Sequence, residues 1–256
     1  VLSRPYGPAD LDPDRAAAGF SHTVLVQAAS TVAETDWMLA LAAAEPSVAG
    51  VVGWIDFESP AGRKALDRLA GTAKFLGVRP MIQDIPDPDW MLRPDIAWAF
   101  DALVERDLSF DALGFPVHLE NFHRLLTRHP DLRVVIDHCL KPRLRDHAAA
   151  PAAFASWAKG MTRLARDTGA CCKLSGLVTE AAPGWSLDTL RPAVAHVLAV
   201  FGPERVMWGS DWPVCRLRAE YGDWFAAAEA LTAGLDEPGR AAVFGGTANG
   251  FYRLGL

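Results

Sequence analysis

The stretch RVMWGSDWP, residues 205–213, has the pattern that decides the fold of this chain. It joins a short apolar run, Arg205 to Trp208, to a Gly-Ser pair, a lone carboxylate at Asp211 and a Trp-Pro turn. A short apolar run bounded by turn residues is typical of a buried β-strand. An unpaired carboxylate at the end of such a strand needs a structural reason, and the rest of the sequence supplies one.

Apolar runs of this kind recur along the whole chain. Each is followed by a polar turn and then by an Ala- and Leu-rich stretch with helical spacing, which is the pattern of a βα repeat. The predicted strands are seven: His22 to Ala28, Val48 to Phe57, Phe75 to Gln83, Leu108 to Phe115, Arg133 to Cys139, Ala170 to Gly176 and Arg205 to Asp211. The predicted helices include Ala33 to Ala44, Asp95 to Arg106, Leu119 to Arg128, Ala152 to Thr168, Leu187 to Phe201 and Gly222 to Ala233.

Single strands that alternate with single helices predict an α/β fold with a parallel sheet. At this length the two candidates are an open doubly wound sheet and a closed, TIM-like (β/α)8 barrel. The chain has no Gly-rich phosphate loop, and its seven repeats favour a barrel whose first strand is missing or very short in this chain. No linker or change of composition divides the sequence, so residues 1–256 are predicted to form a single barrel domain.

Composition excludes several classes of function. The formal charge of −6 and the pI of about 5.6 leave no basic surface for nucleic acid. The 4 cysteines form no Cys-x-x-Cys pair, which indicates free thiols in a reducing compartment. No apolar run approaches the roughly 18 residues of a membrane span, and the first residues do not resemble a signal peptide. We expect a cytoplasmic protein whose partner is a small molecule, with a homo-oligomer left open.

Polar residues gather at the carboxyl ends of the predicted strands, which is where a (β/α)8 barrel places its active site. They are Gln27, Trp54, Asp56, Arg79, Gln83, His118, Asp137, His138, Lys173, Ser175 and Asp211. Alternation along each strand sorts these side chains by face. In this interpretation His138, Lys173 and Asp211 point inward together, whereas Asp137 points the other way.

An inward carboxylate, imidazole and ammonium group suit the hydrolysis of an ester or lactone. Asp211 beside a neutral His138 can take a proton from water and return it to a leaving oxygen. Lys173 or Arg79 can stabilise the negative charge that develops on the carbonyl oxygen. The competing interpretation is that Asp211 only caps the following helix.

Five motifs together give a resemblance to a known family. They are GSDWPV (209–214), IDHCLKP (136–142), CKLSGL (172–177), LGVRPMIQDIPDPDWMLRP (76–94) and FGGTANGFYRL (244–254). With them the chain resembles the metal-dependent amidohydrolase superfamily over almost its whole length. Within it, the chain is most similar to the amidohydrolase-related branch of sugar-lactone and dicarboxylate lactonases. The resemblance implies a barrel that opens a small polar lactone, in first place an aldonolactone of carbohydrate metabolism.

The resemblance also implies roles for individual residues. Asp211 would be the general base and acid, and His138 a histidine of the site. Lys173, with these two, completes the predicted catalytic set. The predicted substrate-binding residues are Arg79, Gln83, Gln27, Trp54, His118 and Trp212.

One departure from the family pattern concerns the metal. The resemblance implies an N-terminal strand with a His-x-His pair that supplies half of a divalent metal site, and this chain starts too late to show it. The expected cofactor is either a zinc ion held in part by Asp211 and His138, or none.

Three interpretations of this departure stay open: a fragment of a longer lactonase, a metal-independent lactonase, or a relative that binds without catalysis. The unpaired strand edges that a missing strand would leave favour the first. The alternative activity is that of a related-barrel decarboxylase acting on an unsaturated or aromatic acid.

Overall fold

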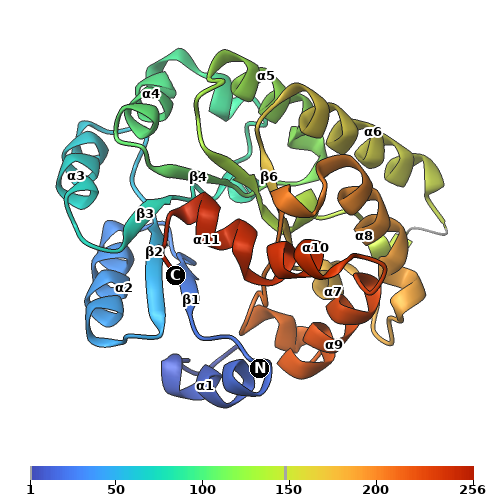
Figure 1. Ribbon diagram of the computed structural model, residues 1–256. Helices are drawn as coiled ribbons and strands as arrows, with labels where there is room; N and C mark the ends of the chain where they lie inside the picture. Colours follow the sequence, from blue (N-terminus) through green and yellow to red (C-terminus); the bar gives the residue numbers. More distant parts are fainter. Residues whose placement is uncertain (1, 147–148) are drawn as a thin grey trace.

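The structure, a computed structural model, describes residues 2–146 and 149–256. Seven parallel strands pair edge to edge in chain order and form one curled sheet (Figure 1). The strands are β1 (Thr23–Val26), β2 (Val48–Gly53), β3 (Phe75–Val78), β4 (Ser109–Ala112), β5 (Val134–Ile136), β6 (Cys171–Leu174) and β7 (Val206–Trp208). All seven predicted strands are present. Each is shorter than predicted because the chain leaves strand geometry before the polar residues that follow.

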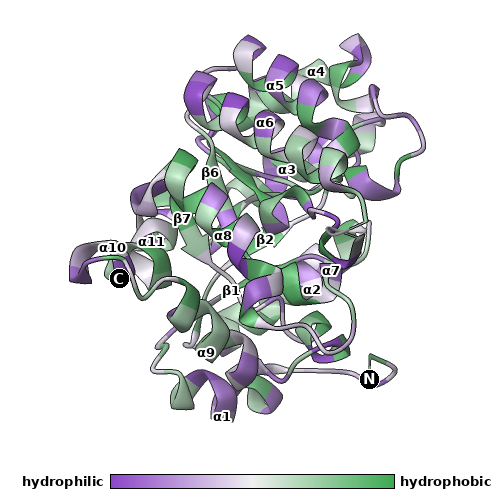
Figure 2. Ribbon diagram, turned by 90° about the vertical axis from the view of Figure 1, so that its right-hand side faces the viewer, coloured by the Kyte–Doolittle hydropathy of each residue, from purple (hydrophilic) through white to green (hydrophobic). Residues whose placement is uncertain are grey.

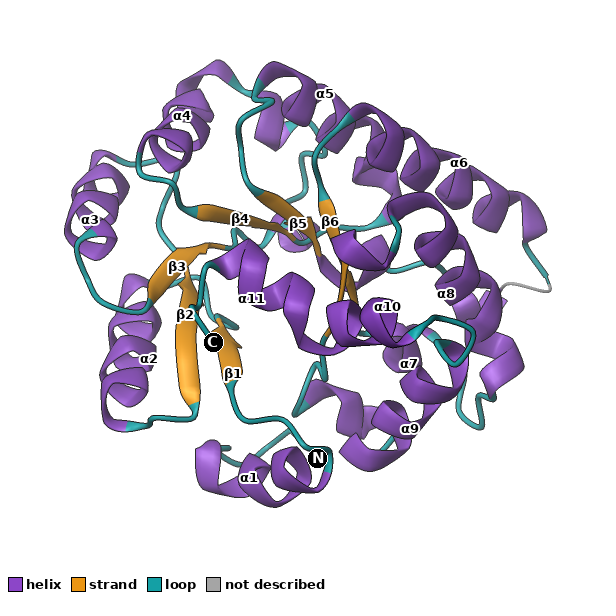
Figure 3. Ribbon diagram, viewed as in Figure 1, coloured by secondary structure: helices purple, strands orange, loops and turns teal. Residues whose placement is uncertain are grey.

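Helices connect the strands, and most of them cover the convex face of the sheet (Figure 3). They are α1 (Pro8–Ala17), α2 (Val32–Ala44), α3 (Pro60–Ala70), α4 (Ala97–Glu105), α5 (Leu119–Arg128), α6 (Pro151–Asp167), α7 (Leu177–Glu180), α8 (Leu187–Phe201), α9 (Tyr221–Leu231), α10 (Glu237–Ala241) and α11 (Thr247–Tyr252). The six predicted helices are confirmed. The sequence interpretation did not include α3, which begins where the Ser59 hydroxyl accepts a hydrogen bond from the Gly62 N–H group.

Amphipathic packing explains why the helices lie on the outside. In α5, Phe122 and Leu125 are buried against the sheet, whereas Glu120 and Arg124 face solvent. Figure 2 shows the same alternation along the outer helices, which carry hydrophilic and hydrophobic residues in turn. One large apolar core therefore lies between the helices and the convex face of the sheet.

The concave face of the sheet carries a second, smaller core that includes the last helix. Phe251 and Tyr252 of α11 pack with Val52, Val135 and Met207 from three strands. The guanidinium of Arg133, which immediately precedes β5, donates a hydrogen bond to the carbonyl oxygen of Phe251. Helix α11 thus closes the curled sheet at the end where the strands begin, and it leaves the opposite mouth as the place for a site (Figure 1).

Strands β1 and β7 are the two edges of the sheet. Within the described residues they do not pair with each other. An aromatic contact links them instead, because Phe20 stacks on Trp208 with ring centroids 4.9 Å apart and planes within 7°. The fold is therefore the expected α/β barrel type, with seven strands and a gap on one side. In the part of the chain described here, no helix combines the length and apolar character needed to cross a bilayer.

Candidate active site

Three neighbouring strands bring Asp211, His138 and Ser175 together at the mouth. His138 follows β5, Ser175 follows β6 and Asp211 lies three residues after β7. The His138 Nε2 atom is 3.7 Å from the Asp211 Oδ1 atom. Its Nδ1 atom is 2.8 Å from the Ser175 hydroxyl oxygen, which fixes the plane of the ring. The structure thus brings the two predicted residues His138 and Asp211 together.

Both of these residues have left-handed backbone conformations. Asp211 has a φ of 54°, and His138 begins a run of four such residues that ends at Lys141. A left-handed conformation costs a non-glycine residue about 1–2 kcal/mol, and such strain is concentrated at functional sites. The run is stabilised from outside, since the Trp157 indole donates a hydrogen bond of 2.8 Å to the Cys139 carbonyl oxygen.

The same left-handed turn corrects the predicted assignment of faces after β5. Val135 belongs to the core on the concave face, and Val134 and Ile136 belong to the core under the helices. Strict alternation would therefore send Asp137 inward and His138 outward. Asp137 does point inward, contrary to the prediction, and His138 reaches the mouth only because the chain turns at that residue.

Lys173 and Arg79 lie in a buried cluster of charges beside this pair. The Lys173 Nζ atom is 2.5 Å from the Asp111 Oδ2 atom and 2.7 Å from the Asp137 Oδ1 atom. The Arg79 guanidinium contacts the other oxygen of Asp137 at 3.0 Å. Because Asp137 is the neighbour of His138 in the chain, the cluster and the Asp211–His138 pair belong to one site.

Burial and charge pull the ionisable groups of this site in opposite directions. Burial lowers the pKa of His138 although the Asp211 and Asp137 carboxylates oppose it, so the imidazole is neutral at neutral pH. Burial also disfavours the charge of Lys173, but its carboxylate neighbours raise the pKa of this amine above its ordinary value. Burial would raise the pKa of Asp137, yet Lys173 and Arg79 hold it below its usual range. Lys173 and Asp137 therefore stay ionised.

The predicted substrate-binding residues lie around this centre at different depths. Gln27 is fully buried, and its amide donates a hydrogen bond of 2.5 Å to the Arg79 carbonyl oxygen. Gln83 accepts a hydrogen bond from the Lys141 ammonium group at the end of the left-handed run. His118 is buried with its Nδ1 atom accepting from the Phe115 N–H group at 3.0 Å, and burial lowers its pKa.

The two predicted aromatic residues are half-buried. The backbone of Trp54 hydrogen-bonds the Thr35 side chain, and Trp212 meets Tyr6 edge to face at 5.1 Å. Within the described residues, neither Trp54 nor Trp212 has a hydrogen bond or ion pair to the catalytic set. Their role in binding substrate stays a prediction.

Sequence reasoning missed Asp111 and Tyr252. Asp111 is fully buried in the middle of β4, and it accepts a hydrogen bond of 2.7 Å from the Tyr252 hydroxyl. The signal for Asp111 was present, because a carboxylate inside the apolar run of residues 108–115 needs a buried partner. No comparable signal marked Tyr252, whose partner lies 141 residues away.

His138 and Asp211 are the residues expected to contribute to a zinc site. His138 and Asp211 offer a nitrogen and an oxygen at a spacing that one ion could bridge. Among the described residues, however, no group of three His, Cys, Asp or Glu side chains could hold a metal ion. These residues therefore do not make a complete zinc site.

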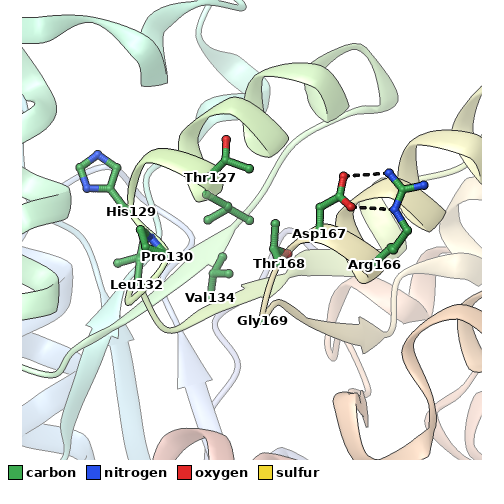
Figure 4. Close-up of a pocket in the computed structure, with 10 residues that line it drawn as sticks. Thr127, His129, Pro130, Leu132, Val134, Arg166, Asp167, Thr168 and Gly169 are labelled. Carbon is green, nitrogen blue, oxygen red and sulfur yellow. Dashed lines mark hydrogen bonds and ion pairs between the residues drawn. The ribbon is translucent and has the colours of Figure 1, made fainter.

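A pocket of about 310 Å³ lies away from this mouth (Figure 4). Leu132 and Val134 line it near the start of β5, and the neighbouring residues Arg166 and Asp167 form an ion pair at one side of it (Figure 4). It contains none of the predicted site residues. The pocket therefore belongs to the end of the fold opposite the candidate site.

Gly176 is predicted to set the position of the His138 ring. It has a φ of +65°, and a Cβ atom placed there would lie 2.8 Å from the His138 Cγ atom. We expect Gly176→Ala to displace the imidazole and to lower kcat/KM by about tenfold or more. It should also lower the free energy of unfolding by about 1–2 kcal/mol.

Gly184→Ala is the matched control for this variant. Gly184 has a φ of +77° and no atom near its Cβ position, so the control carries the backbone strain without the clash. Steady-state kinetics and urea unfolding of both variants check the prediction. Equal losses of activity in the two would show that strain alone, rather than the position of His138, is responsible.

The chain is similar to known proteins in both sequence and structure. The sequence model of the amidohydrolase family matches residues 1–254. An L-fucono-1,5-lactonase from Burkholderia ambifaria is 42% identical over 99% of this chain and 87% of its own length. One from Burkholderia multivorans is 34% identical over 99% of this chain and 88% of its own length. A crystal structure of an amidohydrolase from Burkholderia multivorans with bound zinc has a TM-score of 0.92 and 34% identity, covering 98% of this chain and 90% of that one.

Proposed function

Because this chain belongs to the amidohydrolase family, we propose that it is a sugar lactonase that opens L-fucono-1,5-lactone or a closely related aldonolactone. The observation that carries the proposal is the placement of Asp211 within 3.7 Å of His138, whose chain neighbour Asp137 forms ion pairs with the Lys173 and Arg79 cations. A carboxylate, a neutral imidazole and a fixed positive charge are the groups that lactone hydrolysis needs.

In the proposed reaction, Asp211 and His138 together activate water. Their separation of 3.7 Å is too long for a direct hydrogen bond, and a water molecule can reach both groups. The oxygen of this water attacks the carbonyl carbon of the lactone. At the same time the Asp211 carboxylate takes one proton from the water. His138, whose ring is fixed by Ser175, orients the water in the tautomer that carries the proton on Nε2, because this N–H group donates to the water oxygen.

The attack forms a tetrahedral intermediate whose carbonyl oxygen has become an anion. We assign the stabilisation of this anion to Lys173 and Arg79, the cations of the adjacent buried cluster, which would bind it more strongly than they bind the neutral carbonyl oxygen of the substrate. The bond between the carbonyl carbon and the ring oxygen then breaks. Asp211 returns its proton to that oxygen, so that the products are a hydroxyl group and a carboxylic acid.

Other predicted residues are proposed to bind the sugar, polar groups through its hydroxyl groups and aromatic rings through its C–H faces. Gln83, with Lys141, offers an amide and an ammonium group at the rim, and Trp54 and Trp212 offer apolar ring faces. The described residues do not complete a zinc site, so no step of this mechanism passes through a metal.

The purified protein should release acid from L-fucono-1,5-lactone well above the spontaneous rate. D-glucono-1,5-lactone tests the stereochemistry of recognition, and γ-butyrolactone, which has no hydroxyl groups, should react at least about 10²-fold more slowly. A pH indicator measures the acid released. Turnover of none of the three lactones would contradict the proposal, and carbon dioxide release from an aromatic acid would support the decarboxylase alternative instead.

A further inference from the structure

The two buried carboxylates of the site, Asp111 and Asp137, enclose the amine of Lys173. Its Nζ atom donates a hydrogen bond of 2.5 Å to Asp111 and makes an ion pair of 2.7 Å with Asp137. Both carboxylate side chains are 0% exposed, whereas the Lys173 and Arg79 side chains keep 11% and 12% of their surface. Within this cluster, a substrate that enters the mouth therefore meets the two cations and not the carboxylates of Asp111 and Asp137.

The contacts of Lys173 also limit where its remaining N–H group can point. An ammonium group has three donors, and the two carboxylates take up two sides of it. Buried ion pairs of this kind are weak evidence for stability, since the cost of removing charges from water offsets their attraction. The arrangement does fix the direction of the third N–H group.

A third residue holds Asp111 from the far end of the barrel. The Tyr252 hydroxyl donates to the Asp111 Oδ2 atom at 2.7 Å, which is the same oxygen that Lys173 contacts. Burial raises the pKa of Tyr252 well above its ordinary value, so this hydroxyl stays protonated and remains a donor. Tyr252 in turn is held by helix α11, which Arg133 binds through the neighbouring Phe251 carbonyl.

We propose that Asp111, Asp137 and Tyr252 are positioning residues that aim the Lys173 ammonium at the carbonyl oxygen of the substrate. The carbonyl oxygen belongs to the proposed lactone, so this inference rests on the proposed function. These residues do not touch the substrate. They act through Lys173, and helix α11 becomes a support of the active site rather than only a cap on the barrel.

Lysine NMR tests the arrangement without any substrate. The chain has five lysines, Lys64, Lys74, Lys141, Lys159 and Lys173, so labelling with [13Cε]lysine gives few signals, and Lys173→Arg assigns the one that matters. The groups that face Lys173 are Asp111 from β4, Asp137 after β5, Arg79 after β3 and Tyr252 from α11. We expect its signal to titrate above the ordinary range of lysine.

Asp111→Asn should lower the titration midpoint of Lys173 by about one pH unit or more, because an opposite charge in contact is lost. Tyr252→Phe should move it in the same direction by less. In lactone assays both variants should lose kcat, by about 10–100-fold for Asp111→Asn and several-fold for Tyr252→Phe, with KM little changed. The oxyanion that Lys173 serves exists only after attack, which is why kcat carries the loss.

Tyr221→Phe is the matched control. Tyr221 and Tyr252 are each 4% exposed, but within the described residues the Tyr221 hydroxyl has no hydrogen-bond partner. The control should leave both the Lys173 titration and kcat unchanged.

A Lys173 signal that does not move in a folded Asp111→Asn or Tyr252→Phe variant would overturn the inference, as would an equal shift in Tyr221→Phe. If Asp111→Asn does not fold, Tyr252→Phe decides. Absence of lactone turnover in the wild type would instead remove the proposed function, and the titration would still report whether these residues hold Lys173.

Discussion

Replacing Asp211 by Asn should lower kcat/KM for the preferred lactone by a factor of about 10²–10⁴. An amide cannot take a proton from water or return one to the ring oxygen, so both proton transfers of the proposed mechanism are lost. The fold should persist, because Asn adopts the left-handed conformation of residue 211 as readily as Asp does. Steady-state kinetics, with circular dichroism to check the fold, measures both.

Asp107→Asn is the control for this substitution. Asp107 also has a left-handed backbone, with a φ of 53°, but it precedes β4 at the end of the sheet opposite the mouth. Its replacement should leave turnover unchanged. If Asp211→Asn retains the turnover of the wild type, then Asp211 is not the base and the mechanism above is wrong.

Replacing Lys173 by Met should have the largest effect on stability. The variant leaves two fully buried carboxylates without the cation between them, and breaking a buried pair in this way costs about 3–5 kcal/mol. Because the pKa of Lys173 is raised in the folded protein, the stability that its protonation contributes is fully present below the ordinary pKa of lysine and is lost as the pH rises through the raised value. Activity should fall together with stability.

The pH dependence of this loss identifies its cause. As the pH falls toward the ordinary range of carboxylic acids, the stranded carboxylates of Lys173→Met can take up protons, and the deficit should shrink. Lys74→Met supplies the comparison, since Lys74 donates only to backbone carbonyl oxygens, at 2.6 Å and 2.7 Å for the two shorter bonds. Its cost should not depend on pH between 5 and 8. Urea unfolding of both variants across this range distinguishes the two, and a Lys173→Met deficit that stays constant would contradict the assignment.

The strands and most of the helices could be predicted from the sequence because each is marked by its own neighbours. Strand β5, for example, consists of Val134, Val135 and Ile136 between polar residues. Helix α5 has apolar residues at helical spacing, which predict the face that it buries. The face of the sheet on which a side chain lies could be predicted only within a strand, because side chains alternate between the two faces only there. At His138 the backbone enters the left-handed region. Residues 138–141 include no glycine, which is the residue that usually indicates such a conformation in a sequence.

Most residues of the candidate site could be predicted from the sequence, but most of the contacts between them could not. The polar residues at the strand ends marked Asp211, His138 and Lys173, because strand ends meet at one mouth. The partners of Lys173 could not be predicted from spacing, since Asp111 lies 62 residues earlier in the chain and on a different strand. Which carboxylate meets which cation depends on the curl of the sheet, and the sequence pattern carries no measure of that curl.

The hydrogen bond between Asp111 and Tyr252 joins residues 141 positions apart. During synthesis, 141 further residues, more than half the length of this chain, must therefore be added after Asp111 before that carboxylate can meet the tyrosine. Contacts of such high sequence separation form slowly, and partly folded chains with open interiors are prone to aggregate. The interior of the barrel therefore stays incomplete until helix α11 has been synthesised. Cells that make this protein quickly should need chaperones that bind the incomplete chain and prevent its aggregation.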